Sequence, residues 1–509
     1  TNIIFTVSAR AATVDSALTF TMVLSLLFFV LGSRHAVAAT DRASSEAAPQ
    51  ADGAGSENLT QLHQVSAVKK SSRETFEPWN GQTPTAWWVF VGIYGAMGLA
   101  VLAKGPVGLL LPVAAIGLFR LVIDRLQASP SRATVRRGPL VTALAWTASL
   151  VSPTRFARAT WALRPLTALA VVAVVTVPWF LLVGLRTDGV WLEKFFVEQN
   201  VQRALQAFDN HAGPFFYYVP AILIGFFPWS VFLGPTLIDA VRRVRQSPSR
   251  HASYVFCFCW LAVVVVFWSL VRTKLPHYVL PAYPALALLT GATLAHWLEE
   301  PASLARGWLL NATVTWIVVG ALLVVTLPVV AAYVLPGEGG LGLIGLVLVA
   351  GGVGALLLGW RRQLGRMAAL MVATSALFLI GVFAVAAQRI DRYQNAPPML
   401  DMLAQADDGQ AELAAYRFFR ESFAFYFGRP IPQCQGEEGL ATFLDHAERP
   451  YVLTTDEYVG EIERAFPGRL QVVVRRPRFL KRGELVLLAP VEREGRSRAA
   501  RAGDDATQY

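Results

Sequence analysis

The stretch WLLNATVTWIVVGALLVVTLPVVAA, residues 308–332, carries no charged side chain along its whole length. A helix of about 20 apolar residues crosses a hydrocarbon core about 30 Å thick, so this stretch is long enough to span a membrane. Stretches of the same character recur along the chain and predict ten spans in all, at residues 13–32, 86–103, 106–124, 165–185, 216–238, 253–271, 279–297, 308–332, 340–360 and 367–387.

The composition agrees with a membrane protein. Of the 509 residues, 54% are hydrophobic and only 16% are charged, and the mean hydropathy is +0.45, which excludes an ordinary soluble enzyme. A net charge of +10 would suggest a nucleic-acid partner in a soluble protein. In a membrane protein, basic residues gather in cytoplasmic loops instead, so no nucleic-acid partner is expected. Three scattered cysteines support neither a disulfide framework nor a zinc ribbon.

The distribution of arginine predicts how the spans are oriented. If the loops alternate between the two sides, residues 125–164, 239–252 and 361–366 share one arginine-rich side, which is cytoplasmic by the positive-inside rule. The opposite side receives Asp15, Lys104 and everything after Gln388. We therefore predict a multi-pass protein of the cytoplasmic (inner) membrane whose C-terminal region is extracytoplasmic.

Changes in composition predict five parts. They are a first outer-face segment with its span (1–32), a polar cytoplasmic insertion expected to be disordered (33–85), a transmembrane helical domain (86–387), an extracytoplasmic α/β domain (388–491) and a flexible tail (492–509). The apolar stretch at 143–151 is too short to span and is expected to lie along the surface. In the α/β domain, the pattern predicts strands at 451–453, 472–474 and 485–488 and helices at 410–427 and 456–465.

Two outer segments concentrate polar, charged and aromatic side chains. Residues 191–218 include Glu198, Arg203 and His211, and loops of this kind often carry function. His211 is equally compatible with an ordinary hydrogen-bonded surface position. Residues 272–284 place Arg272, Lys274, His277 and Tyr278 beside three prolines. Irregular backbone at membrane depth is tolerated where it lines a cavity, which favours a pocket; the alternative is a proline-kinked helix start with snorkelling cations.

Two weaker signals lie near the first and second spans. Asp15 stands where water gives way to lipid, where a carboxylate must be paired or solvated, although it could also cap the helix. Lys104-Gly105-Pro106 separates two spans, and a turn between helices would use glycine and proline in any case.

Together these segments resemble the polyprenyl-phosphate-sugar glycosyltransferases of the GT-C fold, which include the bacterial dolichyl-phosphate-mannose protein mannosyltransferases and the aminoarabinose transferases. The resemblance implies an all-α polytopic membrane fold with a small C-terminal α/β domain. The strings that carry it are Arg10 with Asp15, Ala103-Lys104-Gly105-Pro106, Val177-Pro178-Trp179, Glu198-Gln199-Asn200 with Arg203, His211-Ala212-Gly213-Pro214 with Tyr217-Tyr218, Phe227-Pro228-Trp229, Lys274-Leu275-Pro276-His277-Tyr278 and Pro281-Ala282-Tyr283-Pro284.

The resemblance also implies a reaction. A sugar would pass from a polyprenyl phosphate to a hydroxyl of a lipid A-like lipid or of a protein at the outer face, and no nucleotide cofactor would be used. A departing phosphate needs preorganised cations and an acceptor hydroxyl needs a base. The roles implied are catalytic for Asp15 and Glu198, donor-phosphate binding for Arg203, Arg272, Lys274 and Tyr278, and ligation of a divalent metal for His211.

In this family an acidic loop between the first two spans supplies the main catalytic carboxylate. In the present chain that loop would fall before Thr1, so we expect the first spans to be missing. The alternatives to a glycosyltransferase are a catalytically degenerate homologue, a transporter or flippase of lipid-linked sugars, and a membrane scaffold. Transporters place their polar sites near the bilayer midplane, whereas the charged residues here stand at span ends.

Overall fold

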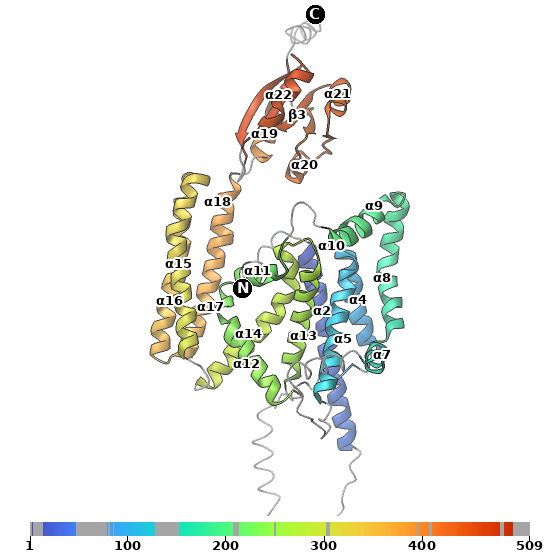
Figure 1. Cartoon of the computed structure of the whole chain (residues 1–509), viewed down its shortest axis with the longest axis vertical. Coiled ribbons are helices and arrows are strands. Elements are labelled where there is room, and N and C mark those ends of the chain that lie inside the picture. Colours follow the sequence, from blue (N-terminus) through green and yellow to red (C-terminus); the bar gives the residue numbers. More distant parts are fainter. Residues whose placement is uncertain are drawn as a thin grey trace, which may run out of the picture. The chain divides into compact units, whose positions relative to one another are not determined.

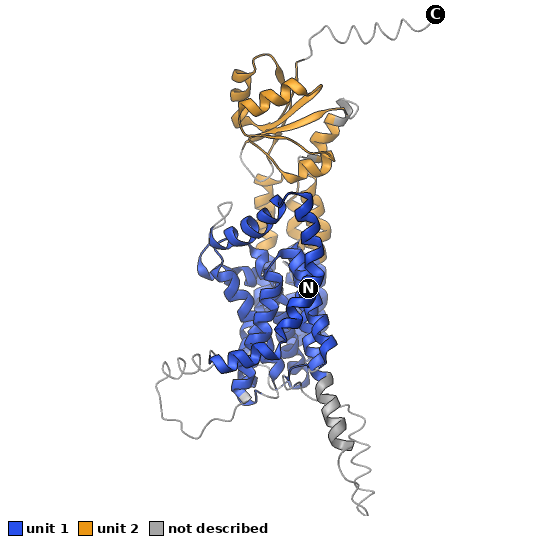
Figure 2. Ribbon diagram, turned by 90° about the vertical axis from the view of Figure 1, so that its right-hand side faces the viewer, with its two compact units in different colours: residues 1–321, 345–379 blue, residues 322–344, 380–509 orange. Residues whose placement is uncertain are grey.

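The computed structural model describes residues 3, 14–46, 79, 82–84, 86–127, 152–206, 213–248, 251–301, 306–393, 396–406, 410–478 and 483–491. The chain divides into two compact units, one formed by residues 1–321 with 345–379 and the other by residues 322–344 with 380–509 (Figure 2). The first unit and the start of the second are helical.

The helices of this region, including π- and 3-10 segments labelled η, follow one another along the chain (Figure 1). They are α2 (Val14–Glu46), α4 (Trp87–Lys104), α5 (Val107–Gln127), α7 (Pro153–Ala162), α8 (Pro165–Arg186), α9 (Val190–Glu193), η1 (Lys194–Gln202), α10 (Arg203–Leu205), η2 (Phe215–Tyr217), α11 (Tyr218–Gly225), η3 (Trp229–Phe232), α12 (Leu233–Gln246), α13 (Ala252–Leu270), η4 (Pro276–Ala282), α14 (Tyr283–Glu299), α15 (Arg306–Val334), η6 (Gly339–Leu343), α16 (Ile344–Trp360), α17 (Leu364–Ile380), η7 (Gly381–Ala386) and α18 (Ala387–Asp391).

The described residues contain nine helices long and apolar enough to cross a membrane, or ten if one bent pair counts as a span. The predicted polytopic helical fold is confirmed. The span predicted at 216–238 is not one straight helix, because it bends by 112° between its two halves, Phe215–Gly225 and Trp229–Gln246. Pro228 lies in the break and has no backbone N–H to continue a helix. The indole Nε1 of Trp316 donates to the Pro228 carbonyl over 3.0 Å.

The first helix is longer than predicted. α2 continues to Glu46, past the expected end at residue 32 and into the segment expected to be disordered. Alanines are frequent beyond residue 35, and alanine has the highest helix propensity. Further along the same segment, Trp79 is 5% exposed and its ring packs against Phe29, Phe119 and Phe256. The apolar stretch 143–151, expected to lie along the surface, falls outside the described residues.

Helices α4, α5 and α8 enclose a long apolar groove. At Gly108 of α5, an added Cβ would lie 2.3 Å from the backbone carbon of Ala100, so the α4–α5 hairpin packs closely. At Gly98 of α4, an added Cβ would lie 2.9 Å from Val175 of α8. Between α5 and α8 remains a cavity of about 1020 Å³, here called the α5–α8 groove, lined by Tyr94, Pro106, Leu109, Leu110, Val113, Ala114, Gly117, Leu118, Leu121, Phe156, Ala159, Thr160, Leu163, Pro165, Ala168, Leu169, Val172, Ala173, Thr176 and Val177.

The C-terminal part of the second unit is a small α/β domain, as predicted. Its elements are α19 (Ala396–Ala406), β1 (Glu412–Tyr416), α20 (Glu421–Phe427), β2 (Gln433–Cys434), α21 (Glu437–His446), β3 (Pro450–Thr455), α22 (Asp456–Ala465), β4 (Leu470–Pro477) and β5 (Glu484–Pro490).

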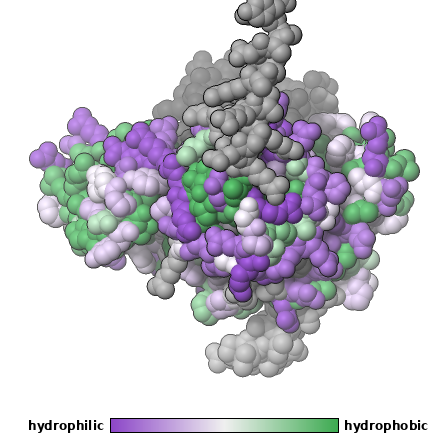
Figure 3. Space-filling model, turned by 90° about the horizontal axis from the view of Figure 1, so that it is seen from above, coloured by the Kyte–Doolittle hydropathy of each residue, from purple (hydrophilic) through white to green (hydrophobic). Residues whose placement is uncertain are grey.

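The sheet of this domain has the strand order β2-β1-β3-β5-β4. β1 is parallel to β2 and β3, whereas β5 is antiparallel to β3 and β4. Helices α19 and α20 contribute to the core on one face of the sheet, and α21 and α22 to the core on the other. The helix predicted at 410–427 is wrong in its first part, because residues 412–416 form β1, an interior strand of the sheet. Figure 3 shows hydrophilic residues over much of the described surface in that view, with hydrophobic residues between them.

Candidate active site

The ends of two spans bring a buried ion pair together. Asp15, in the first turn of α2, is 3% exposed, and its Oδ1 accepts a hydrogen bond from the ammonium of Lys104, the last residue of α4. The other carboxylate oxygen, Oδ2, lies 3.5 Å from Nε2 of His277. A buried carboxylate is costly unless it is paired, and here both of its oxygens have partners.

Aromatic rings enclose the ammonium of Lys104 on another side. Its Nζ lies 4.3 Å from the ring centroid of Tyr278 and 5.2 Å from that of Trp268. The two rings are 4.3 Å apart and inclined by 32°. Electron-rich ring faces attract cations, so the ammonium is held by a carboxylate and two π-systems.

The position of Lys104 depends on the turn that follows it. Gly105 has φ of 75° and donates its N–H to the Val101 carbonyl, which ends α4. A Cβ at Gly105 would lie 2.8 Å from the side-chain nitrogen of Asn200. That amide in turn donates to the Phe195 carbonyl within η1 over 2.7 Å. Glycine is therefore required here both by the positive φ and by the close approach of η1.

Arg203 lies near Lys104 because hydrogen bonds join its segment, residues 203–206, to residues 272–273. The Thr273 hydroxyl lies 2.9 Å from the carbonyl oxygens of both Arg203 and Gln206, and the Arg272 N–H donates to the Ala204 carbonyl over 3.1 Å. The Arg203 guanidinium lies close enough to Tyr278 and Lys104 for its charge to act on both side chains. Asp15, Lys104, Arg203, Trp268, His277 and Tyr278 are together called the span-end cluster.

Lys274 has a different environment from the one predicted for it. It is 5% exposed, and its Nζ donates to the carbonyls of Trp268, Ser269 and Val271 over 3.0, 2.6 and 2.5 Å. An ammonium has three hydrogens, so these carbonyls at the end of α13 use all of them. Burial lowers the pKa of Lys274, while the three acceptors and the negative end of the helix favour its charged form. In this arrangement Lys274 caps α13, and a phosphate would have to replace a carbonyl to reach it.

Glu198 and Arg272 are not brought into this arrangement. Glu198 is half-buried on η1, and among the described residues no ion pair or hydrogen bond joins it to Asp15. The Arg272 side chain is exposed. His211 and Arg10 lie outside the described residues.

A metal ion would need several ligands close together. In the part of the chain that the structure describes, no three His, Cys, Asp or Glu side chains form such a group. The expectation that His211 ligates a divalent metal stays a prediction.

Sequence reasoning placed Asp15, Arg203 and Tyr278 correctly on one side of the spans but underestimated Lys104. The signal available was its charge at a span end on the side that carries few basic residues. Nothing in the sequence indicated Trp268, which belongs to an apolar run, or the pairing of His277 with Asp15. Chemically, the span-end cluster offers two preorganised cations and an imidazole that is oriented by a carboxylate.

No protein-family model matches the chain. The chain is similar in sequence to undecaprenyl phosphate-alpha-4-amino-4-deoxy-L-arabinose arabinosyl transferases. The match to the enzyme of Erwinia tasmaniensis has 36% identity over 129 residues and covers 25% of this chain and 22% of that protein. The match to the enzyme of Pectobacterium atrosepticum has 30% identity over 204 residues and covers 38% of this chain and 35% of that protein. The match to the enzyme of Pseudomonas fluorescens has 30% identity over 226 residues and covers 43% of this chain and 32% of that protein. The chain thus spans about a fifth to a third of the length of these relatives.

Solved structures share the fold. The crystal structure of ArnT from Cupriavidus metallidurans bound to undecaprenyl phosphate superposes with a TM-score of 0.58 at 20% identity, covering 82% of this chain and 72% of that one. Its apo state gives the same TM-score and covers 81% and 71%. The resemblance read from the motifs is therefore confirmed in sequence similarity and in fold, and the chain is a multi-pass membrane protein.

Proposed function

We propose that the protein is an integral-membrane glycosyltransferase that transfers a sugar from a polyprenyl phosphate to a hydroxyl of a lipid A-like lipid or a protein. The observation that supports this most is the placement of the span-end cluster beside the α5–α8 groove. Pro106, which lines the groove, is only two residues from Lys104. Cations next to a long apolar groove complement a phosphate attached to a long apolar chain.

The dimensions of the groove suit a polyprenyl chain. Its lining residues on α5 run from Leu109 to Leu121, a rise of about 18 Å at about 1.5 Å per residue. That is more than half of a hydrocarbon core about 30 Å thick. The lining is almost entirely apolar, so it offers no partner for a sugar or a charged group, which would stay at the end near Lys104.

The charges of the cluster suit the departure of a phosphate. As the bond between the sugar carbon and the phosphate oxygen breaks, negative charge grows on the leaving polyprenyl phosphate. Arg203 and Lys104 would stabilise that charge, and preorganised groups of this kind contribute about 10²- to 10³-fold each. Asp15 would keep Lys104 charged and in place, and Tyr278 would fix Arg203.

The acceptor hydroxyl must lose a proton as its oxygen bonds to the sugar. His277, whose side chain is 36% exposed, is a candidate to accept it, with Asp15 holding the ring and stabilising the imidazolium that forms. Catalytic roles for Asp15 and Glu198 and phosphate contacts from Arg272 and Lys274 stay predictions. The contacts favour an orienting role for Asp15 over that of a free base, because both of its oxygens are occupied.

The names of the relatives make aminoarabinose on undecaprenyl phosphate the first donor to test. We place the protein in the inner membrane with its arginine-rich loops in the cytoplasm. The span-end cluster and the α/β domain would then face outward.

Transfer of radiolabelled sugar from undecaprenyl phosphate, measured in membranes that contain the protein, tests the proposal. The wild type is expected to label lipid or protein, and Lys104→Gln is expected to reduce the rate by about 10²-fold or more. Lys194→Gln is the matched control, because Lys194 is an exposed lysine on η1 outside the cluster. Absence of labelled acceptor in the wild type, or equal rates in the two variants, would refute the proposal.

A further inference from the structure

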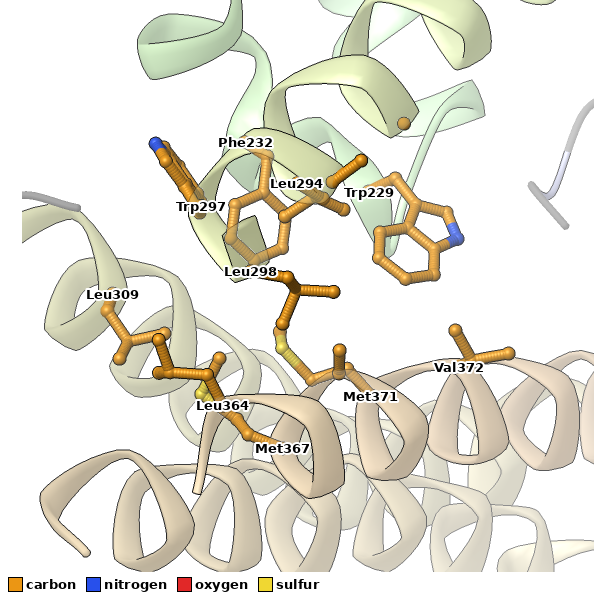
Figure 4. Close-up of a pocket in the computed structure, with 13 residues that line it drawn as sticks. Trp229, Phe232, Leu294, Trp297, Leu298, Leu309, Leu364, Met367, Met371 and Val372 are labelled. Carbon is orange, nitrogen blue, oxygen red and sulfur yellow. The ribbon is translucent and has the colours of Figure 1, made fainter. Parts of the chain in front are cut away.

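A second cavity lies at the opposite end of the spans from Lys104. It has a volume of about 260 Å³ and is enclosed by α14, α15 and α17 together with residues that follow the break near Pro228. Figure 4 shows the side chains of Trp229, Phe232 and Leu294 facing those of Met371 and Val372 across it. The thirteen lining residues are hydrophobic, with the indoles of Trp229 and Trp297 among them, so the cavity offers few hydrogen-bond partners for water. It is here called the α14–α17 cavity.

The depth of the cavity matches one leaflet of a bilayer. Along α17 the lining runs from Leu364, at the first residue of the helix, to Val372. From Leu364 to Val372 the helix rises about 12 Å. Half of a hydrocarbon core is about 15 Å. The cavity therefore reaches from the end of the span to near the middle of the membrane, as a single acyl chain does.

Three exposed arginines lie where α17 begins, at the same end of the helix as the cavity. Arg361 and Arg362 occupy the turn between α16 and α17, and Arg366 lies in the first turn of α17. The turn is fixed, because the N–H groups of Arg362 and Gln363 donate to carbonyls of α16 over 3.0 and 2.9 Å.

The same turn is part of the cavity wall. A Cβ at Gly359 would lie 3.0 Å from Leu309 and 3.5 Å from the sulfur of Met367, two lining residues. Acidic residues at this end, Glu299 and Glu300, terminate α14 on the other side, and Glu300 lies 3.7 Å from His296. The positive charge is thus concentrated on the α16–α17 side.

We propose that the α14–α17 cavity binds one acyl chain of an anionic phospholipid from the leaflet on this side, with the headgroup on Arg361, Arg362 and Arg366. The cavity supplies apolar surface at the depth of the acyl chain, and the arginines supply charge at the depth of the phosphate. Neither part belongs to the span-end cluster, so this lipid is neither donor nor acceptor of the proposed reaction.

Native mass spectrometry of the purified protein in a non-ionic detergent, titrated with phosphatidylglycerol or phosphatidylcholine, tests the proposal. We expect one tightly bound phosphatidylglycerol per chain. Ala368→Phe fills the cavity, and we expect it to weaken that binding by about tenfold, as the loss of an acyl-chain contact of about two methylene groups would. Ala369→Phe is the matched control, since Ala369 is the next residue on α17, is exposed and does not line the cavity.

The headgroup is tested separately. Arg361→Gln, Arg362→Gln and Arg366→Gln together are expected to remove the preference for phosphatidylglycerol over phosphatidylcholine, which should be about tenfold or more in the wild type. If Ala368→Phe does not fold, Gly291→Leu serves instead, because a Cβ at Gly291, another lining residue, meets no atom within 4 Å. Equal binding of the two lipids to the wild type, or equal loss in Ala368→Phe and Ala369→Phe, would overturn the proposal.

Discussion

Replacing Asp15 with Asn tests the ion pair on which the span-end cluster depends. Asp15 is 3% exposed and the Lys104 side chain is 16% exposed, so the variant leaves a largely buried ammonium without its counter-ion. Removing one partner of a buried pair costs about 3–5 kcal/mol. The ring faces of Tyr278 and Trp268 still hold the ammonium, so we expect the lower end of that range, about 3 kcal/mol, in the free energy of unfolding.

The double variant Asp15→Asn with Lys104→Met separates pairing from simple damage. The double variant leaves neither charge of the pair without its partner. Its loss in the free energy of unfolding should therefore be smaller than the summed losses of the two single variants, by about 1 kcal/mol or more. Unfolding would be followed by denaturant titration in micelles, with Asp239→Asn as control. That residue pairs with Arg243 in a partly exposed i,i+4 bridge, for which about 0.5 kcal/mol is expected. The reasoning would be refuted if the losses of the two single variants simply added up in the double variant. It would also be refuted if Asp15→Asn lowered the free energy of unfolding no more than Asp239→Asn does.

Three further variants address the neighbourhood of the cluster. Lys274→Met removes three hydrogen bonds from the end of α13 and should lower the free energy of unfolding by about 2 kcal/mol, whereas a purely phosphate-binding lysine would change the KM for donor and leave unfolding intact. Gly105→Ala, strained by its positive φ and by Asn200, should lower the free energy of unfolding by about 1–3 kcal/mol, while Gly95→Ala, where the Cβ meets no atom, should be neutral or stabilising in the same denaturant titration. Gly117→Leu projects into the α5–α8 groove and should raise the KM for a long-chain donor by about tenfold without changing the KM for a donor with one or two isoprene units; equal effects on both donors would contradict the proposed place of the chain.

The spans could be predicted because lipid imposes a simple requirement on them. Backbone groups in hydrocarbon must be paired within one helix, and its side chains must be apolar, so residues such as 308–332 admit one interpretation. No such local rule decides which residues of the C-terminal domain form strands of its sheet. Residues 412–416 read as helix because glutamate, leucine and alanine favour helices. They form β1 instead. This strand lies between β2 and β3 and is covered on both faces, so burial outweighs the intrinsic helix propensity of its residues.

The candidate site was predictable in its location and not in its pairings. Charge on the side with few basic residues, together with prolines at a span end, indicated where Arg203 and Tyr278 gather. That Lys104 pairs with Asp15 across 89 positions of sequence depends on how α2 and α4 pack. The use of Lys274 as a helix cap depends on where the backbone turns after α13. The ion pair and the helix cap both depend on tertiary structure, and no local sequence pattern indicates either of them.

The bent crossing near Pro228 has a consequence for how the protein is made. Its two helical halves, Phe215–Gly225 and Trp229–Gln246, rise about 16 and 27 Å at about 1.5 Å per residue, and each falls short of about 30 Å of hydrocarbon. Contacts that hold them come from parts synthesised later: the Tyr283 hydroxyl donates to the Ala221 carbonyl over 3.3 Å and the Trp316 indole to the Pro228 carbonyl. During biosynthesis this crossing must therefore wait for α14 and α15 to leave the ribosome and enter the bilayer before it acquires its final geometry, which makes it a late step in membrane assembly.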